Sequence, residues 1–281
     1  MRLLNVNGRA SVLRDGVAID IEIASAGKFG ADVATIYRDW QALRAWEADH
    51  AGPGEPYAPS DLGSPVTEPR QLFAIGLNYR EHAAETGIAL PDTPMVFTKF
   101  ATSITGPYAT VVMPTDTVDW EAELVVVIGR RAEAVTRDQA WDHVAGLTIG
   151  QDLSERTLQV KPPAPQQFSL AKSFPGFAPI GPVLVTPDEF ESPDDLAIGC
   201  RIGDEVVQSS RTGDLIFGVP ALVEYLSSIT TLLPGDVIFT GTPSGIGMAR
   251  TPQRYLRDGD ELTTWIDGIG TMTQRFVRAP R

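Results

Sequence analysis

The chain has 281 residues, of which 43% are hydrophobic, and its formal net charge at pH 7 is -13. A chain of this size can bury a substantial core without disulfides, and its one cysteine, Cys200, fits a reducing cytoplasm. The negative charge argues against nucleic acid or an anionic membrane as a partner. No apolar run approaches the ~20 residues of a membrane-spanning helix, so we expect a soluble, cytoplasmic protein without a membrane partner.

The first 66 residues are predicted to form a small α+β domain that ends in a linker. Strand-like pieces lie at residues 3–6 and 17–23, and apolar residues between 36 and 46 recur at helical spacing. The stretch 47–70 is rich in Pro, Gly, Ser and acidic residues and lacks apolar periodicity, which is typical of a linker. The remaining residues, 67–281, are predicted to form the main domain.

The main domain is rich in strand-forming residues. Runs of β-forming residues occur at 123–129, 235–241 and 261–277, with Gly and Asp supplying the turns between strands. Helical periodicity is clearest at residues 136–144 and 219–229. We therefore predict an α+β fold built largely on antiparallel or mixed sheet.

His82 and Glu85 are three residues apart in a helix-like segment, so their side chains would share one face of a turn. A carboxylate beside an imidazole can orient the ring and raise its basicity, which suits a general base for water. A surface helix with a salt-bridged histidine is the structural alternative. The spacing alone favours that alternative.

Glu121 and Glu123 begin a strand-forming run, where residues two apart point to the same face. Their charges would repel each other unless a cation lies between them, although acid pairs also occur on solvated strand edges. Asp152 follows the apolar segment 146–150 and could supply a third oxygen ligand. Three carboxylates suit Mg²⁺ or Mn²⁺, whereas zinc sites prefer His and Cys, and the chain has only three histidines.

Four further residues are candidates for holding an anionic substrate. Arg156 and Gln159 are three residues apart, and a guanidinium pairs with a carboxylate in bidentate fashion. Lys172 is a lone cation in an apolar context and could neutralise a substrate carboxylate or an enolate, although loop lysines are usually solvated. Thr242 lies in the glycine-rich segment 241–247, which lacks the spacing of a phosphate or dinucleotide loop.

Six segments, taken in order, resemble the fumarylacetoacetate hydrolase family. The resemblance spans about residues 70–277, nearly all of the chain after the linker. One segment alone would be weak support, but six collinear ones are specific. The matching segments are 76–85, 119–124, 152–159, 172–174, 231–243 and 268–271.

The resemblance implies a mixed β-roll of the fumarylacetoacetase C-terminal type, usually a homodimer, behind the small N-terminal domain. It implies Mg²⁺ or Mn²⁺ on Glu121, Glu123 and Asp152. It also implies that His82 and Glu85 activate water, on a segment that often orders over the substrate. The positions that match substrate-holding residues of the family are Arg156, Gln159, Lys172 and Thr242.

The leading hypothesis is a metal-dependent hydrolase that cleaves a carbon–carbon bond in a small 2,4-dioxo acid, such as an acylpyruvate or fumarylpyruvate. His82, oriented by Glu85, would take a proton from water, and Lys172 would help to stabilise the departing pyruvate enolate. The same enolate chemistry also fits an oxaloacetate-type 2-oxo acid decarboxylase or a 2-hydroxydienedioate isomerase. A non-catalytic metal- or oxo-acid-binding protein is a further alternative, but it would give the His82 and Glu85 pair no purpose.

Overall fold

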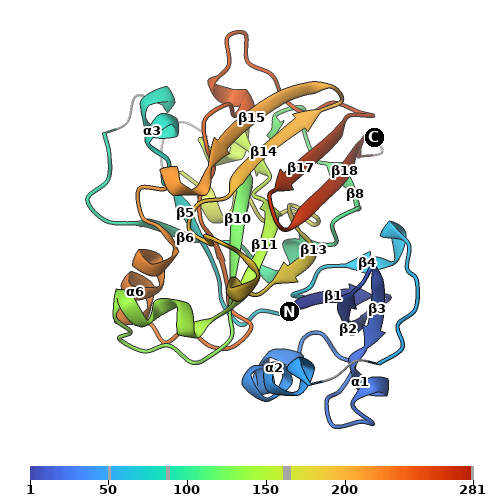
Figure 1. Ribbon diagram of the computed structural model, residues 1–281. Helices are drawn as coiled ribbons and strands as arrows, with labels where there is room; N and C mark the ends of the chain where they lie inside the picture. The colour runs from blue at the N-terminus through green and yellow to red at the C-terminus, as the bar shows by residue number, and fades with distance from the viewer. Residues whose placement is uncertain (50–51, 87–88, 161–165, 280–281) are drawn as a thin grey trace.

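Strands dominate the part of the chain that the computed structural model describes, residues 1–49, 52–86, 89–160 and 166–279 (Figure 1). They form an eleven-stranded sheet, a five-stranded sheet and a two-stranded ribbon. Most neighbouring strands are antiparallel, but β16 (Val237–Phe239) runs parallel to β5 (Leu72–Gly76), so the large sheet is mixed. The predicted α+β class, with mixed sheets and few helices, is confirmed.

The large sheet has β10 and β11 near its centre. Every residue of both strands is buried, which explains why their sequences read as continuous apolar runs rather than alternating ones. Its order is β3–β2–β1–β13–β11–β10–β16–β5–β6, with β4 paired to β1 and β7 paired to β13. The strands not yet given bounds are β1 (Arg2–Val6), β2 (Arg9–Arg14), β3 (Val17–Asp20), β4 (Leu62–Gly63), β6 (Met95–Thr98), β7 (Ile104–Thr105), β10 (Ala122–Ile128), β11 (Val144–Gln151) and β13 (Ala178–Val185).

The five-stranded sheet covers β10 and β11, as Figure 1 shows. Leu262 and Met272 of this sheet belong to the same apolar core as Leu124 and Leu147 of the large sheet. The predicted strand region 261–277 is a hairpin of β17 and β18. The strands of the five-stranded sheet are, in order, β15 (Glu205–Arg211), β14 (Ala197–Ile202), β17 (Glu261–Ile266), β18 (Gly270–Arg278) and β8 (Thr110–Met113).

Helices are short and lie around the sheets. The predicted helix 219–229 is present as α6, but the segment predicted at 136–144 forms a 3-10 helix, η4 (Arg137–His143). The strand predicted at 17–23 ends at Asp20, because the Asp20 carboxylate caps a new helix by accepting the Ile23 N–H at 3.0 Å. The helices are α1 (Ile21–Ala24), α2 (Trp40–Ala48), α3 (Arg80–Thr86), α4 (Arg156–Gln159), α5 (Phe168–Ala171) and α6 (Val219–Ile229).

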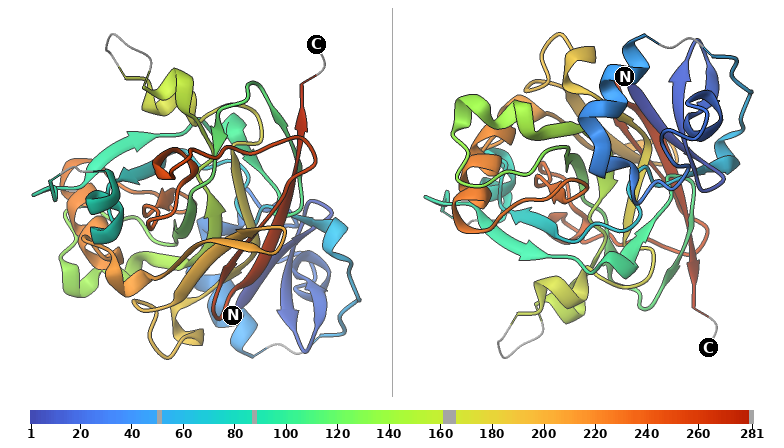
Figure 2. Two further views of the ribbon diagram at one scale, coloured as in Figure 1. Left: turned by 90° about the horizontal axis from the view of Figure 1, so that it is seen from above. Right: turned by 90° about the horizontal axis from the view of Figure 1, so that it is seen from below.

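The N-terminal strands extend the large sheet, because β1 pairs with β13 and places Leu3 opposite Leu184. Figure 2 shows this N-terminal part on the opposite side of the molecule from α4 and α5. The described part of the predicted linker, 47–70, packs back on these strands through β4, which pairs with β1. The predicted domain boundary between residues 66 and 67 stays a prediction. None of the helices formed by the described residues is long and apolar enough to cross a membrane.

Candidate metal centre and substrate cavity

Three buried carboxylates lie close together where the start of β10 is beside the end of β11. Glu123 lies on β10, Glu121 comes just before this strand, and Asp152 follows β11. Because β10 and β11 are antiparallel, with Ala122 opposite Gln151, the start of one strand lies beside the end of the other. One oxygen from each of the three carboxylates lies within 4.8 Å of the other two. The structure thus brings together the three residues predicted as metal ligands.

Three buried cations surround these carboxylates. Lys172 Nζ donates to Glu121 Oε2 and to Asp152 Oδ2, both at 2.7 Å. Lys99 Nζ donates to Asp152 Oδ1 at 2.6 Å and to the carbonyl oxygen of Lys172. Arg156 Nη2 lies 2.8 Å from Glu121 Oε1. Lys99 is not among the residues predicted from the sequence, although a lysine in the apolar segment 95–100 is itself a signal, since a buried lysine needs an anionic partner.

Glu121 and Glu123 have opposite pKa shifts. Burial alone would raise the pKa of Glu121, but Lys172 and Arg156 outweigh it and lower the pKa to about 2. The pKa of Glu123 is raised well above its usual value by burial and by the charges of Asp152 and Glu121. Its Oε2 accepts the Gly241 N–H at 2.8 Å. The negative charge of Glu123 is therefore not fully compensated by the residues around it.

This donor set fits a divalent cation. Carboxylate oxygens are the ligands that Mg²⁺ and Mn²⁺ prefer, and the raised pKa of Glu123 marks a charge that a cation would stabilise. Among the described residues, Glu121, Glu123 and Asp152 form the cluster whose ligand atoms lie close enough to hold a metal.

Arg156 and Gln159 are brought together on α4. Arg156 Nη1 donates to Gln159 Oε1 at 2.7 Å, and Arg156 Nε donates to Asp119 Oδ2 at 2.8 Å. Asp119 is buried, and it reaches Arg156 because the ribbon of β9 (Val118–Asp119) and β12 (Ser154–Glu155) pairs Asp119 with Ser154. Asp119 is a second residue without a predicted role, although it stands two positions before Glu121 in the sequence.

Thr242 has most of its hydrogen-bonding capacity occupied. Its hydroxyl donates to the Ala122 carbonyl at 3.0 Å and accepts from Gln208 Nε2 at 2.8 Å. Because a hydroxyl has one hydrogen and two lone pairs, the Thr242 side chain can accept one more hydrogen bond but cannot donate to a substrate carboxylate. Its predicted contact with substrate is therefore restricted to accepting.

The predicted His82 and Glu85 pair forms on α3. His82 Nδ1 lies 3.2 Å from Glu85 Oε2, and the other Glu85 oxygen accepts the Gly245 N–H at 3.0 Å. His82 is buried, whereas α3 lies at the outside of the molecule (Figure 1). The helix thus directs His82 inward and is fixed through Glu85 to the loop around Gly245.

A cavity of about 470 Å³ joins these groups. Its lining includes most of the polar residues predicted from the sequence: His82, Glu121, Arg156, Gln159, Lys172 and Thr242. Glu123 and Asp152 lie behind this surface, at the acid cluster that Glu121 shares with them. The roles of all nine predicted residues stay predictions. Six of them line this cavity, Glu85 contacts His82, and Glu123 and Asp152 cluster with Glu121.

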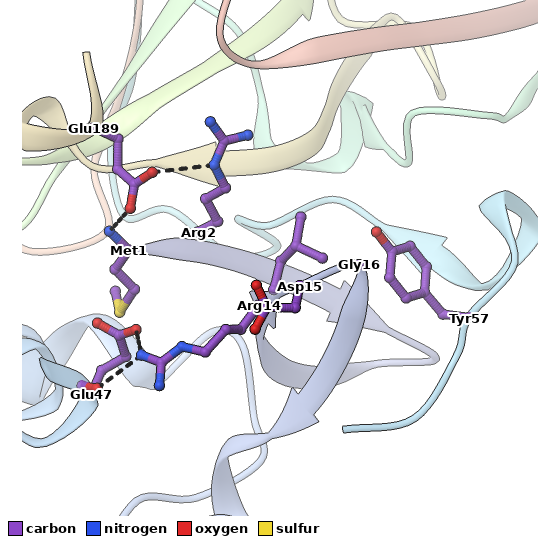
Figure 3. A pocket seen from close by; sticks show the side chains of 9 residues that line it. Met1, Arg2, Arg14, Asp15, Gly16, Glu47, Tyr57 and Glu189 are labelled. Carbon is purple, nitrogen blue, oxygen red and sulfur yellow. Dashed lines mark hydrogen bonds and ion pairs between the residues drawn. The ribbon is translucent and has the colours of Figure 1, made fainter. Parts of the chain in front are cut away.

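A second cavity, of about 460 Å³, lies beside the N-terminal strands (Figure 3). Most of its charged groups are ion-paired with one another: Arg14 pairs with Glu47 at 2.5 Å, and Glu189 accepts from the Met1 amine at 2.7 Å and from Arg2 at 3.3 Å. The first cavity, beside the acid cluster, is therefore the candidate active site.

Residues 71–277 match the family model described as fumarylacetoacetate (FAA) hydrolase C-terminal. The chain belongs to this family. Human oxaloacetate tautomerase FAHD2A, a mitochondrial protein, is 42% identical over 216 residues, which cover 76% of this chain and 68% of the relative. The predicted membership of the fumarylacetoacetate hydrolase family is confirmed, while the predicted cytoplasmic location stays a prediction.

Solved structures of the family share the fold over the whole chain. A protein of Mycobacterium smegmatis, provisionally named HpcE, is 52% identical with a TM-score of 0.96, and the match covers 100% of both chains. Maleylpyruvate hydrolase from Sphingobium sp. SYK-6, solved with a manganese(II) ion and pyruvate, is 28% identical with a TM-score of 0.82 and covers 100% of both chains. Proteins similar to this chain therefore include one named as a tautomerase and one named as a hydrolase.

Proposed function

We propose that this protein is a metal-dependent hydrolase that cleaves a carbon–carbon bond in a 2,4-dioxo acid of the acylpyruvate type. The observation that carries the proposal is that His82 and Glu121, a member of the acid cluster, line one cavity of about 470 Å³. Hydrolysis requires an activated water and a stabilised leaving group. The cavity has a candidate for each requirement, His82 for the water and the charged cluster for the leaving group.

The charged end of the cavity suits the 2-oxo acid part of the substrate. Glu121, Glu123 and Asp152 would hold Mg²⁺ or Mn²⁺, which when bound supplies Lewis-acid polarisation of a carbonyl group. Lys172 Nζ donates to two carboxylates and keeps a third N–H for a substrate oxygen. Arg156, oriented by Asp119, also keeps N–H groups that can bind the substrate carboxylate.

His82 is the proposed general base. Glu85 beside Nδ1 favours the tautomer with its proton on Nδ1, which leaves Nε2 to accept a proton from water. The oxygen of this water bonds to the distal carbonyl carbon of the substrate, and the bond between that carbon and the central methylene then breaks. The electron pair passes to the pyruvate part, which Lys172 stabilises as an enolate until its carbon takes up a proton. The products are pyruvate and a carboxylic acid.

Oxaloacetate tautomerisation is the second candidate, favoured by the names of the curated relatives from rat and human, at 39% and 42% identity. This reaction moves a proton between carbon and oxygen and consumes no water. His82 would then take a proton directly from the substrate carbon instead of from water. Oxaloacetate-type decarboxylation and 2-hydroxydienedioate isomerisation would likewise proceed without an attacking water.

A substrate panel separates these reactions. Acylpyruvates, fumarylpyruvate and oxaloacetate are each supplied with Mg²⁺, Mn²⁺ or EDTA, and pyruvate formation, carbon dioxide release and the keto to enol ratio are measured. We expect acylpyruvates to yield pyruvate with either metal and none in EDTA. Full activity in EDTA after dialysis would exclude the metal, and faster interconversion of oxaloacetate forms than cleavage of any acylpyruvate would favour the tautomerase.

Replacing the proposed base tests water activation directly. His82→Ala should lower kcat for the best acylpyruvate ~10²–10⁴-fold and leave the metal Kd little changed, because the imidazole lies outside the acid cluster. His143→Ala is the matched control, since His143 lies at the end of η4, where its ring contacts the Arg131 carbonyl, and it does not line the cavity. Near-normal turnover by His82→Ala would contradict water activation by this residue.

A further inference from the structure

We infer that the cavity accepts an uncharged, apolar acyl group and disfavours a second carboxylate at that end of the substrate. The inference deepens the proposed function and rests on it for the binding of the 2-oxo acid end at the charged cluster. It concerns the rest of the cavity, where substrate selection would occur.

Among the described lining residues, three of the four ionisable groups are gathered at one end of the cavity. Lys172 and Arg156 both contact Glu121, at 2.7 and 2.8 Å, so these three residues form one ion-paired cluster. His82 is the other ionisable residue among the described residues that line the cavity. The polar end is thus suited to a single 2-oxo acid group.

Apart from the uncharged polar side chains of Gln159, Gln166 and Thr242, the rest of the described lining is apolar. On β6, Met95 and Phe97 point to the same face, and the ring of Phe97 lies 5.9 Å from that of Phe168 on α5. Lys172 Nζ lies 5.2 Å from the centroid of the Phe97 ring, so this wall begins directly beside the charged cluster. The other apolar side chains of the described lining are Ile75, Leu77, Val160, Ile246 and Met248.

Gly76 on β5 makes room for the Met95 side chain. A Cβ atom at this position would lie 2.1 Å from Met95 Cε. Met95 and Gly76 are opposite each other in the pairing of β5 with β6. The glycine therefore allows a long apolar side chain to lie across the strand and form the wall of the cavity.

The difference between an apolar and a charged tail follows from desolvation. When an apolar chain moves from water to this wall, each methylene makes the free energy of binding more favourable. A carboxylate instead loses its hydration and needs a compensating partner. The two cations of the lining are already paired, Lys172 with Glu121 and Asp152, and Arg156 with Asp119 and Glu121. Their remaining N–H groups lie at the cluster, where the first carboxylate binds. Within the described lining, a second carboxylate would have no cation of its own.

Binding of 2-oxo acids that cannot be hydrolysed tests the inference without relying on turnover. Isothermal titration in saturating Mn²⁺ compares 2-oxobutanoate, 2-oxohexanoate and 2-oxooctanoate with the dicarboxylate 2-oxoadipate. We expect the Kd to fall about fourfold per added methylene. 2-Oxoadipate should bind at least about tenfold more weakly than 2-oxohexanoate, which has the same chain length. Equal or tighter binding of 2-oxoadipate would overturn the inference.

A charge placed on the apolar wall should reverse this preference. Met95→Lys is expected to favour 2-oxoadipate over 2-oxohexanoate, whereas the matched variant Met95→Leu should keep the preference for the apolar chain. Met248→Lys repeats the test from a different segment if Met95→Lys fails to fold. Two folded lysine variants that both retain the original ratio would count against the assignment of this wall.

Turnover distinguishes a failure of the inference from a failure of the proposed function. If hexanoylpyruvate is cleaved with a higher kcat/KM than fumarylpyruvate, both stand. If fumarylpyruvate is the better substrate, only the inference falls. If no acylpyruvate is cleaved while 2-oxooctanoate still binds more tightly than 2-oxoadipate, the proposed function falls and the inference about the cavity stands.

Discussion

Lys99 is a buried ammonium group that links two parts of the candidate site. It donates both to the Asp152 carboxylate and to the main chain of Lys172, so it holds a proposed metal ligand beside a proposed substrate-binding residue. Burial and the nearby charge of Lys172 lower the pKa of Lys99, although Asp152 opposes this shift. Lys99 is therefore part of the charge balance of the cluster rather than a solvated lysine.

Replacing this ammonium should destabilise the protein most when no metal is present. We predict that Lys99→Met lowers the free energy of unfolding by about 3 kcal/mol in EDTA, because it leaves the Asp152 charge buried with less compensation. In saturating Mn²⁺ the loss should be smaller, since a bound cation supplies positive charge at the same carboxylates. Urea unfolding followed by circular dichroism measures both values.

The control for this change is Lys28→Met. Lys28 is exposed, with its ammonium 5.1 Å from the Phe29 ring centroid, so its loss should cost about 1 kcal/mol or less under both conditions. An equal loss for Lys99→Met in EDTA and in Mn²⁺ would show that Lys99 stabilises the fold independently of the acid cluster.

The loop of residues 244–248 is hydrogen-bonded on one side to α3, which carries the proposed base, and on the other side to Asp119 at the end of β9, two positions before Glu121. Ser244 and Gly245 donate to Glu81 and Glu85 of α3, at 3.3 and 3.0 Å. The Gly247 N–H on the other side of the loop donates to Asp119 at 2.7 Å. The position of His82 over the cavity therefore depends on the conformation of this loop.

Gly245 offers a sensitive test of that dependence. Its φ is +103°, and a Cβ atom there would lie 2.1 Å from the Val207 carbonyl oxygen, so Gly245→Ala must displace the loop. We predict a fall in kcat/KM of about 10²-fold, because a displacement of about 1 Å in catalytic geometry can have this effect. Steady-state rates with the best acylpyruvate measure it, and a thermal melt checks folding.

Gly259 provides the matched control. Its φ of +85° imposes similar backbone strain, but nothing lies within 4 Å of an added Cβ, and it belongs to a turn before β17. Gly259→Ala should therefore lower stability modestly and leave kcat/KM within about twofold of the parent. Parent-like rates in both glycine variants would show that the loop does not position the base.

Elements with strong local patterns could be predicted from the sequence. The apolar run of β10 and the stripe of α6 appear near their expected positions because burial of the whole strand or of one helix face requires those patterns. β2 was not predicted, since Arg9–Arg14 has charged ends and only a short apolar centre. The 3-10 form of η4 likewise depends on packing against α6 that periodicity does not encode.

Some residues of the candidate site could likewise be predicted from local sequence patterns, and others could not. His82 and Glu85 lie three residues apart, as do Arg156 and Gln159, and these pairs could be predicted from spacing or from the family resemblance. Lys99 is 53 residues from Asp152, and no local pattern marks a partner so distant in the sequence. Its place in the cluster follows only from the tertiary fold, which brings the residue that follows β6 to the residue that follows β11.

At the scale of the whole molecule, β6 forms one end of the large sheet and exposes apolar side chains beside α5. Val96 on β6 is 39% exposed, Phe100 just after it 51%, and Leu170 on α5 52%. Hydrogen bonds from Thr98 to Ser169 and from Phe100 to Ser173 hold these two segments together. An edge strand with exposed apolar residues is a favourable surface for association. The same strand carries Met95 and Phe97 of the cavity wall, so association here would also stabilise that wall.

We predict that the protein is a homodimer in which this surface, formed by Val96, Phe100 and Leu170, is buried. Light scattering at micromolar concentration should give twice the chain mass of 30.3 kDa. Phe100→Asp combined with Leu170→Asp should shift the protein toward monomer, because dimerisation would then bury unpaired carboxylates. Ile229→Asp is the control, since Ile229 is 69% exposed at the end of α6 and should not affect assembly. A parent mass near 30.3 kDa would refute the dimer, and a dimeric double variant would place the interface elsewhere.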